Sequence, residues 1–548
     1  MECPILKTLN KGSTRMRKKP VGLIVALILA FFLRLVNLLY FHGLESDEAL
    51  YAQVISALSN GYIPYKDIFV GHPPVYFYLA MPFFMVFPSL YTIRLYNVLL
   101  GLVNLFLIFV ICRSVYNDKI ATIAALVYAL YPFAIYSSKL VLVDNAAALF
   151  ITLSVLVLVE YIRKKKSKNI LFCGLFAGLS CMTKFTGISV SIAIFLFILF
   201  RLRKVKDTVL YVLGLIIFPI LTLIALLNTG IWEYFYTQTI EWQLIRFGLY
   251  PIEKLWFEVQ GIAILSPLIT FTTLAVVKGK SKVYEELMVF LFLVPLAFIL
   301  LFKVVFLQYF IILLFPLCVL SARFLDKYFP LNAVVFKKRS FFKIKHSKKN
   351  IVKAAVLILV VISFYTKLAW IYGGDWFLTL SCVYNTDQHR LLEKQIMVGN
   401  YIKNITDKNE KIWSSNAAFS FLSERLIVPP QSEYWKFQGF FPDVWGYQWS
   451  TGDYREPIIG HPNGLFRLID IQRAWEEEKP KLIIIDRNST VDYFVWSGIN
   501  NINHVELGLS EYIQKNYRQV TDEEGRNLAI IGVDVWERNG NLDQTSEH

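Results

Sequence analysis

The stretch FHGLESDEALYAQVISALSNGYIPYKDIFVGHPPVYFYLA, residues 41–80, determines how the rest of the chain is interpreted. It follows an apolar run at 21–40 that is about 20 residues long, the length that crosses a bilayer as a helix. Two adjacent carboxylates, Asp47 and Glu48, come soon after that run, and a GHPP turn at 71–74 leads into further apolar sequence. Charged side chains are unexpected so close to the end of a membrane span, and the rest of the sequence indicates why this acid pair is there.

The composition is that of a membrane protein. Of the 548 residues, 56% are hydrophobic and only 18% are charged, whereas soluble domains carry roughly a quarter charged residues. The net charge of +15 comes from basic clusters that adjoin apolar runs, at 15–19, 163–168, 201–206, 278–282 and 337–349. This is the pattern of cytoplasmic loops under the positive-inside rule, and it argues against nucleic-acid binding because no soluble basic domain is left to carry it.

Apolar segments of membrane-spanning length recur along the first two thirds of the chain. We expect about eleven transmembrane helices, at 21–40, 92–112, 119–137, 143–162, 169–183, 186–200, 208–228, 259–277, 284–302, 304–322 and 351–371. With the basic leader 1–20 in the cytoplasm, alternation puts every basic loop on the cytoplasmic side. The loop at 41–91 and the tail after Trp370 then lie on the extracytoplasmic side. The sequence therefore predicts a polytopic α-helical membrane protein with its transmembrane domain at 21–371.

The segment 169–200 decides this alternation. As a single helix it would be about 48 Å long, against about 30 Å of hydrocarbon. It would also hold Lys184 in mid-membrane, which is costly, and put two basic clusters on opposite sides. We therefore expect two short helices joined by a turn at MTKFTG, residues 182–187.

The tail at 372–548 has the pattern of a separate extracytoplasmic domain. Short apolar runs predict buried strands at 411–416, 481–486 and 527–533, and helical periodicity marks 387–403, 467–478 and 509–517. Strands that alternate with helices predict a small α/β domain. The tail contains neither a GxGxxG nor a P-loop motif, so the sequence predicts no nucleotide site there.

The acids admit structural and functional interpretations. Asp47 and Glu48 could be solvated side chains of an exposed loop. However, the loop at 41–91 is long and rich in aromatic residues, so we expect it to lie along the membrane surface as amphipathic helices, one of which begins at the acid pair. Asp144, at the outer end of the fourth span, either caps that helix or joins Asp47 on the outer face. Two carboxylates on one face suit acid–base chemistry or a cation.

Cationic side chains are expected on the same face. Lys139, Lys184, Arg246 and Lys303 all fall in or beside outer turns. A lysine there usually extends to the membrane surface, but Lys184 and Lys303 occupy turns so short that a phosphate head group is the natural partner. Carboxylates, cations and aromatic rings above an apolar bundle suit a lipid-phosphate sugar, with the cations on the phosphate and an acid activating the acceptor hydroxyl.

Four motifs in order along the chain resemble the GT-C glycosyltransferases related to protein O-mannosyltransferases and the lipid A aminoarabinose transferase. They are the stretch from SDEALYAQ to GHPP, VLVDNAAALF at 141–150, GLFAGLSCMTKFTG at 174–187 and LQYFIILLFPLCVLSA at 307–322. The resemblance covers roughly residues 20–325. It implies an integral-membrane enzyme whose donor is a polyprenyl- or dolichyl-phosphate sugar and whose acceptor is a protein, lipid or glycan.

The resemblance also implies roles for individual residues. Asp47 would act as general base toward the acceptor, with inversion at the anomeric carbon, and Glu48 and Asp144 would be the accompanying acids. Lys184 would approach the donor phosphate, and His72 takes the position before the two prolines.

Further substrate-binding candidates are Lys139, Arg246, Lys303 and Tyr309, the last from the tyrosine-proline span. Some relatives carry a carboxylate immediately before the double-proline turn, where this chain has Gly71. That departure argues against a metal site built on this acid. It leaves Asp47 and Asp144 as the candidate ligands of any divalent ion.

Three other interpretations compete with this one. An oligosaccharyltransferase is also of GT-C type, but its WWD-type motif is matched neither by DVWGYQW at 443–449 nor by GGDW at 373–376. A transporter or flippase for lipid-linked sugars predicts internal repeats and charges within the spans, and the sequence shows no repeat and few such charges. A structural scaffold would not need paired acids on the face that carries Lys184 and Lys303.

Overall fold

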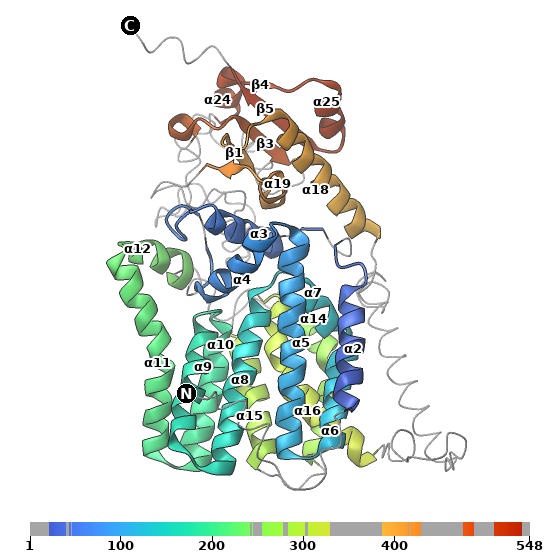
Figure 1. Cartoon of the computed structure of the whole chain (residues 1–548), viewed down its shortest axis with the longest axis vertical. Helices are drawn as coiled ribbons and strands as arrows, with labels where there is room; N and C mark the ends of the chain where they lie inside the picture. The colour runs from blue at the N-terminus through green and yellow to red at the C-terminus, as the bar shows by residue number, and fades with distance from the viewer. Residues whose placement is uncertain are drawn as a thin grey trace, which may run out of the picture.

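The structure is a computed structural model, and it describes residues 21–39, 43–44, 46–68, 70–241, 244, 255–277, 283–301, 305–328, 386–414, 416–428, 475–486 and 509–539. Three layers follow one another along its long axis (Figure 1). A helical bundle forms one end, and a five-stranded sheet with its helices forms the other. Helices α3 (Ser46–Ser59) and α4 (Val75–Val86) lie between them.

Helices lie at ten of the eleven segments predicted to span the membrane. They are α2 (Val21–Leu35), α5 (Leu90–Val115), α6 (Asp118–Leu130) with α7 (Pro132–Lys139), α8 (Val143–Lys164), α9 (Ser167–Cys181), α10 (Thr186–Leu196) with η1 (Phe197–Leu202), α11 (Val205–Asn228), α14 (Leu255–Val277), α15 (Val283–Ile299), and η4 (Leu307–Phe310) with α16 (Ile311–Tyr328). The eleventh segment, at 351–371, lies outside the described residues. Within the described ranges, four helices (α5, α8, α11 and the η4–α16 helix) are long and apolar enough to cross a bilayer, and the bent pair α6–α7 makes a fifth.

The predicted helical hairpin of α9 and α10 is confirmed. The two helices are separated by a break at 182–185. Beside the break Gly187 packs against Ser180, and farther from it the Ser191 hydroxyl donates to the Ala177 carbonyl, so the two helices run antiparallel. The backbone of the break meets the start of α4, which places it at the end of the bundle next to the middle layer.

The bend of 60° between α6 and α7 has a local cause. Pro132 has no N–H and cannot bond to the Tyr128 carbonyl four residues earlier. The buried guanidinium of Arg34, from α2, donates instead to the carbonyls of Tyr128 (3.4 Å), Ala129 (3.1 Å) and Ala134 (3.2 Å). An arginine inside the bundle therefore donates to the carbonyl that the proline leaves free and to two others at the bend, as a membrane interior requires.

The helix predicted to begin at the acid pair is confirmed as α3, but its surroundings differ from the prediction. Instead of lying at a surface with one polar side, α3 is enclosed, and Ala52, Val54 and Ile55 are fully buried. Helix α4 packs against it, and so does α19 (Ala417–Ser423) from the far end of the chain. After its acidic first turn, α3 carries small and branched apolar residues nearly all round, so it has little polar face to offer water.

The C-terminal unit, which we define as residues 386–539, is built on a mixed sheet of order β2-β1-β3-β5-β4. The strands are β1 (Lys411–Ser414), β2 (Leu426–Ile427), β3 (Leu482–Asp486), β4 (Tyr517–Gln519) and β5 (Val533–Arg538). β1 pairs in parallel with β2 and β3, whereas β5 pairs antiparallel with β3 and β4. Helices α18 (Thr386–Ile405), α24 (Leu509–Asn516) and α25 (Glu523–Ile530) accompany the sheet.

Most of the predicted elements of the tail match this unit. β1 and β3 form at 411–416 and 481–486, and α18 and α24 form at 387–403 and 509–517. The predicted helix at 467–478 is described only from residue 475, and the predicted domain boundary at 372 lies outside the described residues.

The strand predicted at 527–533 is wrong. This apolar run is the end of α25, and the strand β5 begins only at its last residue, Val533. Asp522 caps the helix by accepting a hydrogen bond from the Gly525 N–H, and Gly532, at φ +87°, makes the turn into the strand. The apolar run alone suggested a strand, but the helix cap before it and the turn glycine near its end make most of it helical.

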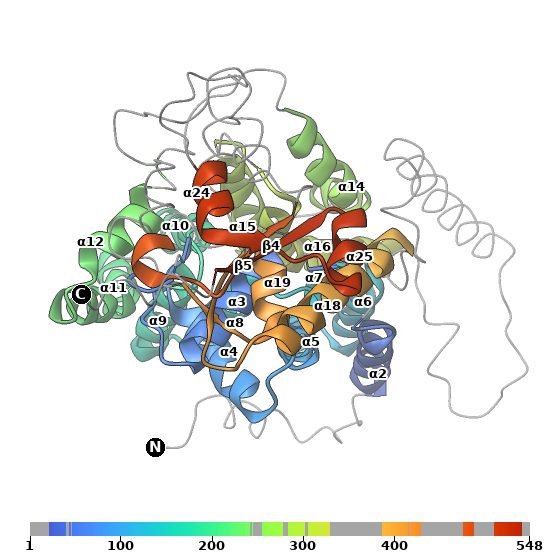
Figure 2. The same cartoon turned by 90° about the horizontal axis from the view of Figure 1, so that it is seen from above.

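The C-terminal unit packs directly on the rest of the molecule. Leu392 of α18 and Ala418 and Phe421 of α19 belong to the same buried apolar cluster as the residues of α3 and the bundle. Seen from above, α18 and α19 lie across the end of the bundle, with α19 over α3 (Figure 2). The first-turn acids of α3 therefore lie at a junction between two parts of the chain.

Candidate active site

Glu48 forms a buried ion pair with Arg94 of α5. Arg94 Nε donates to Oε1 at 2.9 Å and Nη2 donates to Oε2 at 2.7 Å, and the Val141 N–H adds a third bond to Oε1 at 3.0 Å. The same guanidinium donates to the carbonyls of Leu38 (3.2 Å) and Leu39. Glu48 is only 3% exposed, so the interpretation as a solvated acid is wrong for this residue. Its contacts tie α3 to α5 and to the chain that enters α8.

The neighbouring Asp47 is half-buried and has a different environment. Gln308 Nε2 donates to Asp47 Oδ2 at 2.6 Å. In the described part of the chain, Asp47 Oδ1 has no hydrogen-bond partner. An amide that holds one oxygen fixes the orientation of the carboxylate and leaves the other oxygen to accept a proton.

Asp144 and Lys184 form a second buried pair, with Nζ to Oδ2 at 2.7 Å. Helix α8 begins at Val143 without a side-chain cap, so Asp144 is not the helix cap that the sequence also allowed. Lys184 is 2% exposed and does not extend to the surface. Asp144 Oδ1 has no hydrogen-bond partner among the described residues.

The one-turn helix η4 connects the two acid sites. Gln308 contacts Asp47, and the next residue, Tyr309, presents its ring to the Lys184 ammonium at 4.6 Å from the ring centre. This distance is that of a cation–π contact. Two successive side chains thus bring Asp47 and the Lys184–Asp144 pair to one place beneath the C-terminal unit.

The GHPP turn borders this place. His72 Nε2 and the Tyr51 hydroxyl of α3 share a hydrogen bond of 2.7 Å, and the Tyr65 hydroxyl donates to the His72 carbonyl at 3.0 Å. Just after the turn, the Val75 N–H donates to the Met182 carbonyl at 3.1 Å. The turn therefore joins α3 to the hairpin of α9 and α10.

Of the remaining predicted cations, Lys139 lies among the described residues. Lys139 is buried, and its Nζ donates to the Val36 carbonyl at 2.8 Å, at the end of α2. Arg246 and Lys303 lie outside the described residues.

The residues of the site do not form a metal-binding set. Over the ranges that the structure describes, no three His, Cys, Asp or Glu side chains gather in a way that could hold an ion. One oxygen of each carboxylate is already engaged, Asp144 Oδ2 by Lys184 and Asp47 Oδ2 by the Gln308 amide.

Sequence reasoning missed Arg94 and Gln308. A signal existed for Arg94, because an arginine near the start of an apolar span marks a functional or paired group. The sequence gives no such signal for Gln308, because a neutral amide beside a span is common. Its role becomes visible only in the fold, where it contacts Asp47.

Comparisons with known proteins show what the chain is similar to in sequence and in fold. Residues 71–227, which include His72, Asp144 and Lys184, match the family described as dolichyl-phosphate-mannose-protein mannosyltransferase. No curated protein sequence matches the chain. ArnT from Cupriavidus metallidurans bound to undecaprenyl phosphate has a similar structure, with a TM-score of 0.57 and 13% identity over 95% of this chain and 98% of that one. AglB from Archaeoglobus fulgidus, an archaeal oligosaccharyltransferase in complex with an inhibitory peptide and a dolichol-phosphate, has a TM-score of 0.51 and 10% identity over 95% of this chain and 74% of that one.

The chain has the fold of the GT-C glycosyltransferases, and the predicted resemblance to that superfamily is confirmed.

Proposed function

We propose that the chain is an integral-membrane glycosyltransferase that moves a sugar from a polyprenyl- or dolichyl-phosphate donor to an acceptor hydroxyl on the extracytoplasmic face. One observation carries the proposal: a half-buried carboxylate and a buried lysine–carboxylate pair converge on the turn η4. The family match and the GT-C fold support the same chemistry.

Asp47 is the general base of the proposed reaction. Its free Oδ1 accepts the proton of the acceptor hydroxyl while that oxygen attacks the anomeric carbon of the donor. The bond between the anomeric carbon and the phosphate oxygen breaks on the opposite face, and its electron pair leaves with the lipid phosphate. The new glycosidic bond therefore has the inverted configuration.

Lys184 stabilises the phosphate as it leaves. An ammonium has three N–H donors, and one of them goes to Asp144, which leaves the others for phosphate oxygens. Burial strengthens this interaction, because a charge pair in a water-poor site is screened less than in water. Asp144 and the Tyr309 ring keep the ammonium in place before the donor arrives.

A second candidate is the transfer of a whole lipid-linked glycan, as in an oligosaccharyltransferase. The fold similarity to AglB favours it, although the chain covers only 74% of that protein. The donor that the protein consumes distinguishes the two candidate functions. Consumption of a lipid-phosphate monosaccharide supports the leading proposal, and consumption of a lipid-linked oligosaccharide supports the second.

The test is consumption of tritium-labelled dolichyl-phosphate mannose, with the undecaprenyl-phosphate sugars in parallel, by membranes that contain the full-length chain. The readout is the loss of the intact labelled donor on thin-layer chromatography, because transfer to a protein, glycan or lipid acceptor consumes the donor, whereas a flippase leaves it unchanged. Asp47→Asn should lower turnover by about 10²- to 10⁴-fold, the usual contribution of a general base. Asp118→Asn, the same chemical change at the opposite end of the bundle, should retain turnover. Wild-type turnover in Asp47→Asn would refute the mechanism.

A further inference from the structure

Asp47 lies between two anchors that come from different parts of the molecule. On the bundle side, Arg94 holds Glu48, the very next residue. On the other side, Gln395 of α18 holds Leu44, three residues before Asp47. The base of the proposed reaction is therefore placed from both sides, and one of these sides is the C-terminal unit.

The contact between Gln395 and Leu44 uses both ends of the side-chain amide. The Leu44 N–H donates to Gln395 Oε1 at 2.8 Å, and Gln395 Nε2 donates to the Leu44 carbonyl at 2.7 Å. Both residues are buried. One side chain thus satisfies both backbone groups of a residue that belongs to no helix or strand, and no water is needed to replace a missing partner.

Neighbouring contacts make the same connection. An added Cβ at Gly43 would lie 2.6 Å from the Leu391 side chain, so the backbone before α3 packs closely against α18. After α3 ends, the Tyr62 hydroxyl donates to the Ile427 carbonyl at 3.0 Å. Burial raises the pKa of Tyr62 to about 12, so this hydroxyl stays protonated at neutral pH. The C-terminal unit therefore holds the chain on both sides of α3.

We infer that Gln395 is a positioning residue for the transfer reaction, and that the C-terminal unit sets the location of Asp47 through the Gln395–Leu44 contact. The inference rests on the proposed role of Asp47. Positioning acts on the chemical step, where a misplacement of about 1 Å costs about 10²-fold in rate. Donor binding depends instead on Lys184, which is held by Asp144 of the bundle.

The experiment uses the full-length chain and tritium-labelled dolichyl-phosphate mannose. Gln395→Ala should lower kcat by about 10- to 100-fold and leave KM for the donor within about twofold. Gln395→Glu, which can still accept from the Leu44 N–H but cannot donate to its carbonyl, should fall between Ala and wild type.

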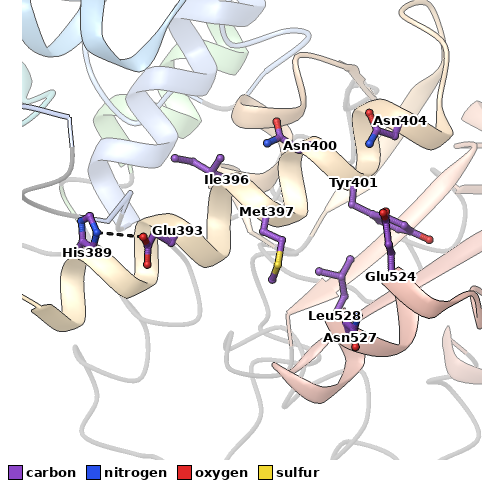
Figure 3. Close-up of a pocket in the computed structure, with 10 residues that line it drawn as sticks. All are labelled: His389, Glu393, Ile396, Met397, Asn400, Tyr401, Asn404, Glu524, Asn527 and Leu528. Carbon is purple, nitrogen blue, oxygen red and sulfur yellow. Dashed lines mark ion pairs between the residues drawn. The ribbon is translucent and has the colours of Figure 1, made fainter.

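Asn400→Ala is the matched control on the same helix. Asn400 is exposed on this helix and is one of the residues, with Met397 and Tyr401, that line a cavity of about 580 Å³ (Figure 3). This variant should keep wild-type kcat. An equal loss of kcat in Asn400→Ala and Gln395→Ala would overturn the inference, because the cause would then be a general loosening of α18.

Wild-type kcat in Gln395→Ala, alongside an inactive Asp47→Asn, would also overturn the inference while the proposed function stands. An active Asp47→Asn would instead refute the proposed function. If Gln395→Ala does not fold, Gln395→Met decides, because it keeps most of the side-chain volume and deletes both hydrogen bonds to Leu44. A several-fold lower kcat at unchanged KM supports the inference, and wild-type kcat overturns it.

Discussion

Replacing Arg94 with methionine should destabilise the protein severely, because it removes one partner of a buried ion pair and keeps the other. Among the described residues, Glu48 would retain only the Val141 N–H as a donor, although its carboxylate is buried. The methionine fills most of the space, so the effect reports on charge and hydrogen bonding rather than on a cavity.

The magnitude follows from the ion pair and the hydrogen bonds that the guanidinium makes. Breaking a buried pair by removing one partner costs about 3–5 kcal/mol, and the Leu38 carbonyl, which is left without its donor, adds about 1 kcal/mol. The expected destabilisation is therefore about 4–6 kcal/mol, a large part of the roughly 5–15 kcal/mol that keeps a typical protein folded. Changing Glu48 to glutamine as well should restore about 2 kcal/mol of the free energy of unfolding, because the double variant no longer buries an unpaired charge.

The assay is the apparent melting temperature in detergent, measured by fluorescence-detected size exclusion under one heating protocol for every variant. The set is wild type, Arg94→Met, Glu48→Gln and the double variant. The double variant should melt above Arg94→Met. A wild-type melting temperature for Arg94→Met, or a double variant as unstable as the two single changes combined, would refute the role assigned to this pair.

Two other predictions concern the base and the sheet. Gln308→Ala should lower kcat about tenfold with donor KM unchanged, because the Asp47 carboxylate loses the amide that orients it; donor-consumption kinetics that show a raised KM and normal kcat would contradict this. The Arg518 side chain, followed by Lys481, holds the pKa of Glu537 below its usual value. Because the folded-state pKa is the lower one, this stabilisation exists above the ordinary pKa of glutamate and is lost as pH falls through the folded value. Wild type should therefore melt slightly above Arg518→Gln at neutral pH, and the two should converge in strong acid; a constant gap across pH would contradict the assignment.

The parts of the site that follow from single-chain geometry are predictable from the sequence. The turn at Lys184 follows from the length of an apolar run compared with the thickness of a bilayer, and the same alternation places Asp47 and Asp144 at one end of the bundle. The contact of Lys184 with Asp144 agrees with that placement.

The partners of the acids are not predictable in this way. Glu48 and Arg94 are 46 residues apart, and Leu44 and Gln395 are 351 apart, so only tertiary packing brings them together. Sequence periodicity describes the faces of one helix and contains no information about which distant element covers them. For this reason the sequence predicts α3 at a surface, whereas α19 buries it.

The turn η4 has a consequence for how such a site can change. A single peptide bond separates Gln308, which contacts the base, from Tyr309, which contacts the cation. A shift of this backbone by one residue would put the neighbouring side chain in each position and break both contacts at once. Under the proposed mechanism the same turn serves proton transfer and phosphate binding, so its length is constrained. Substrate preference would then change through the surrounding loops instead.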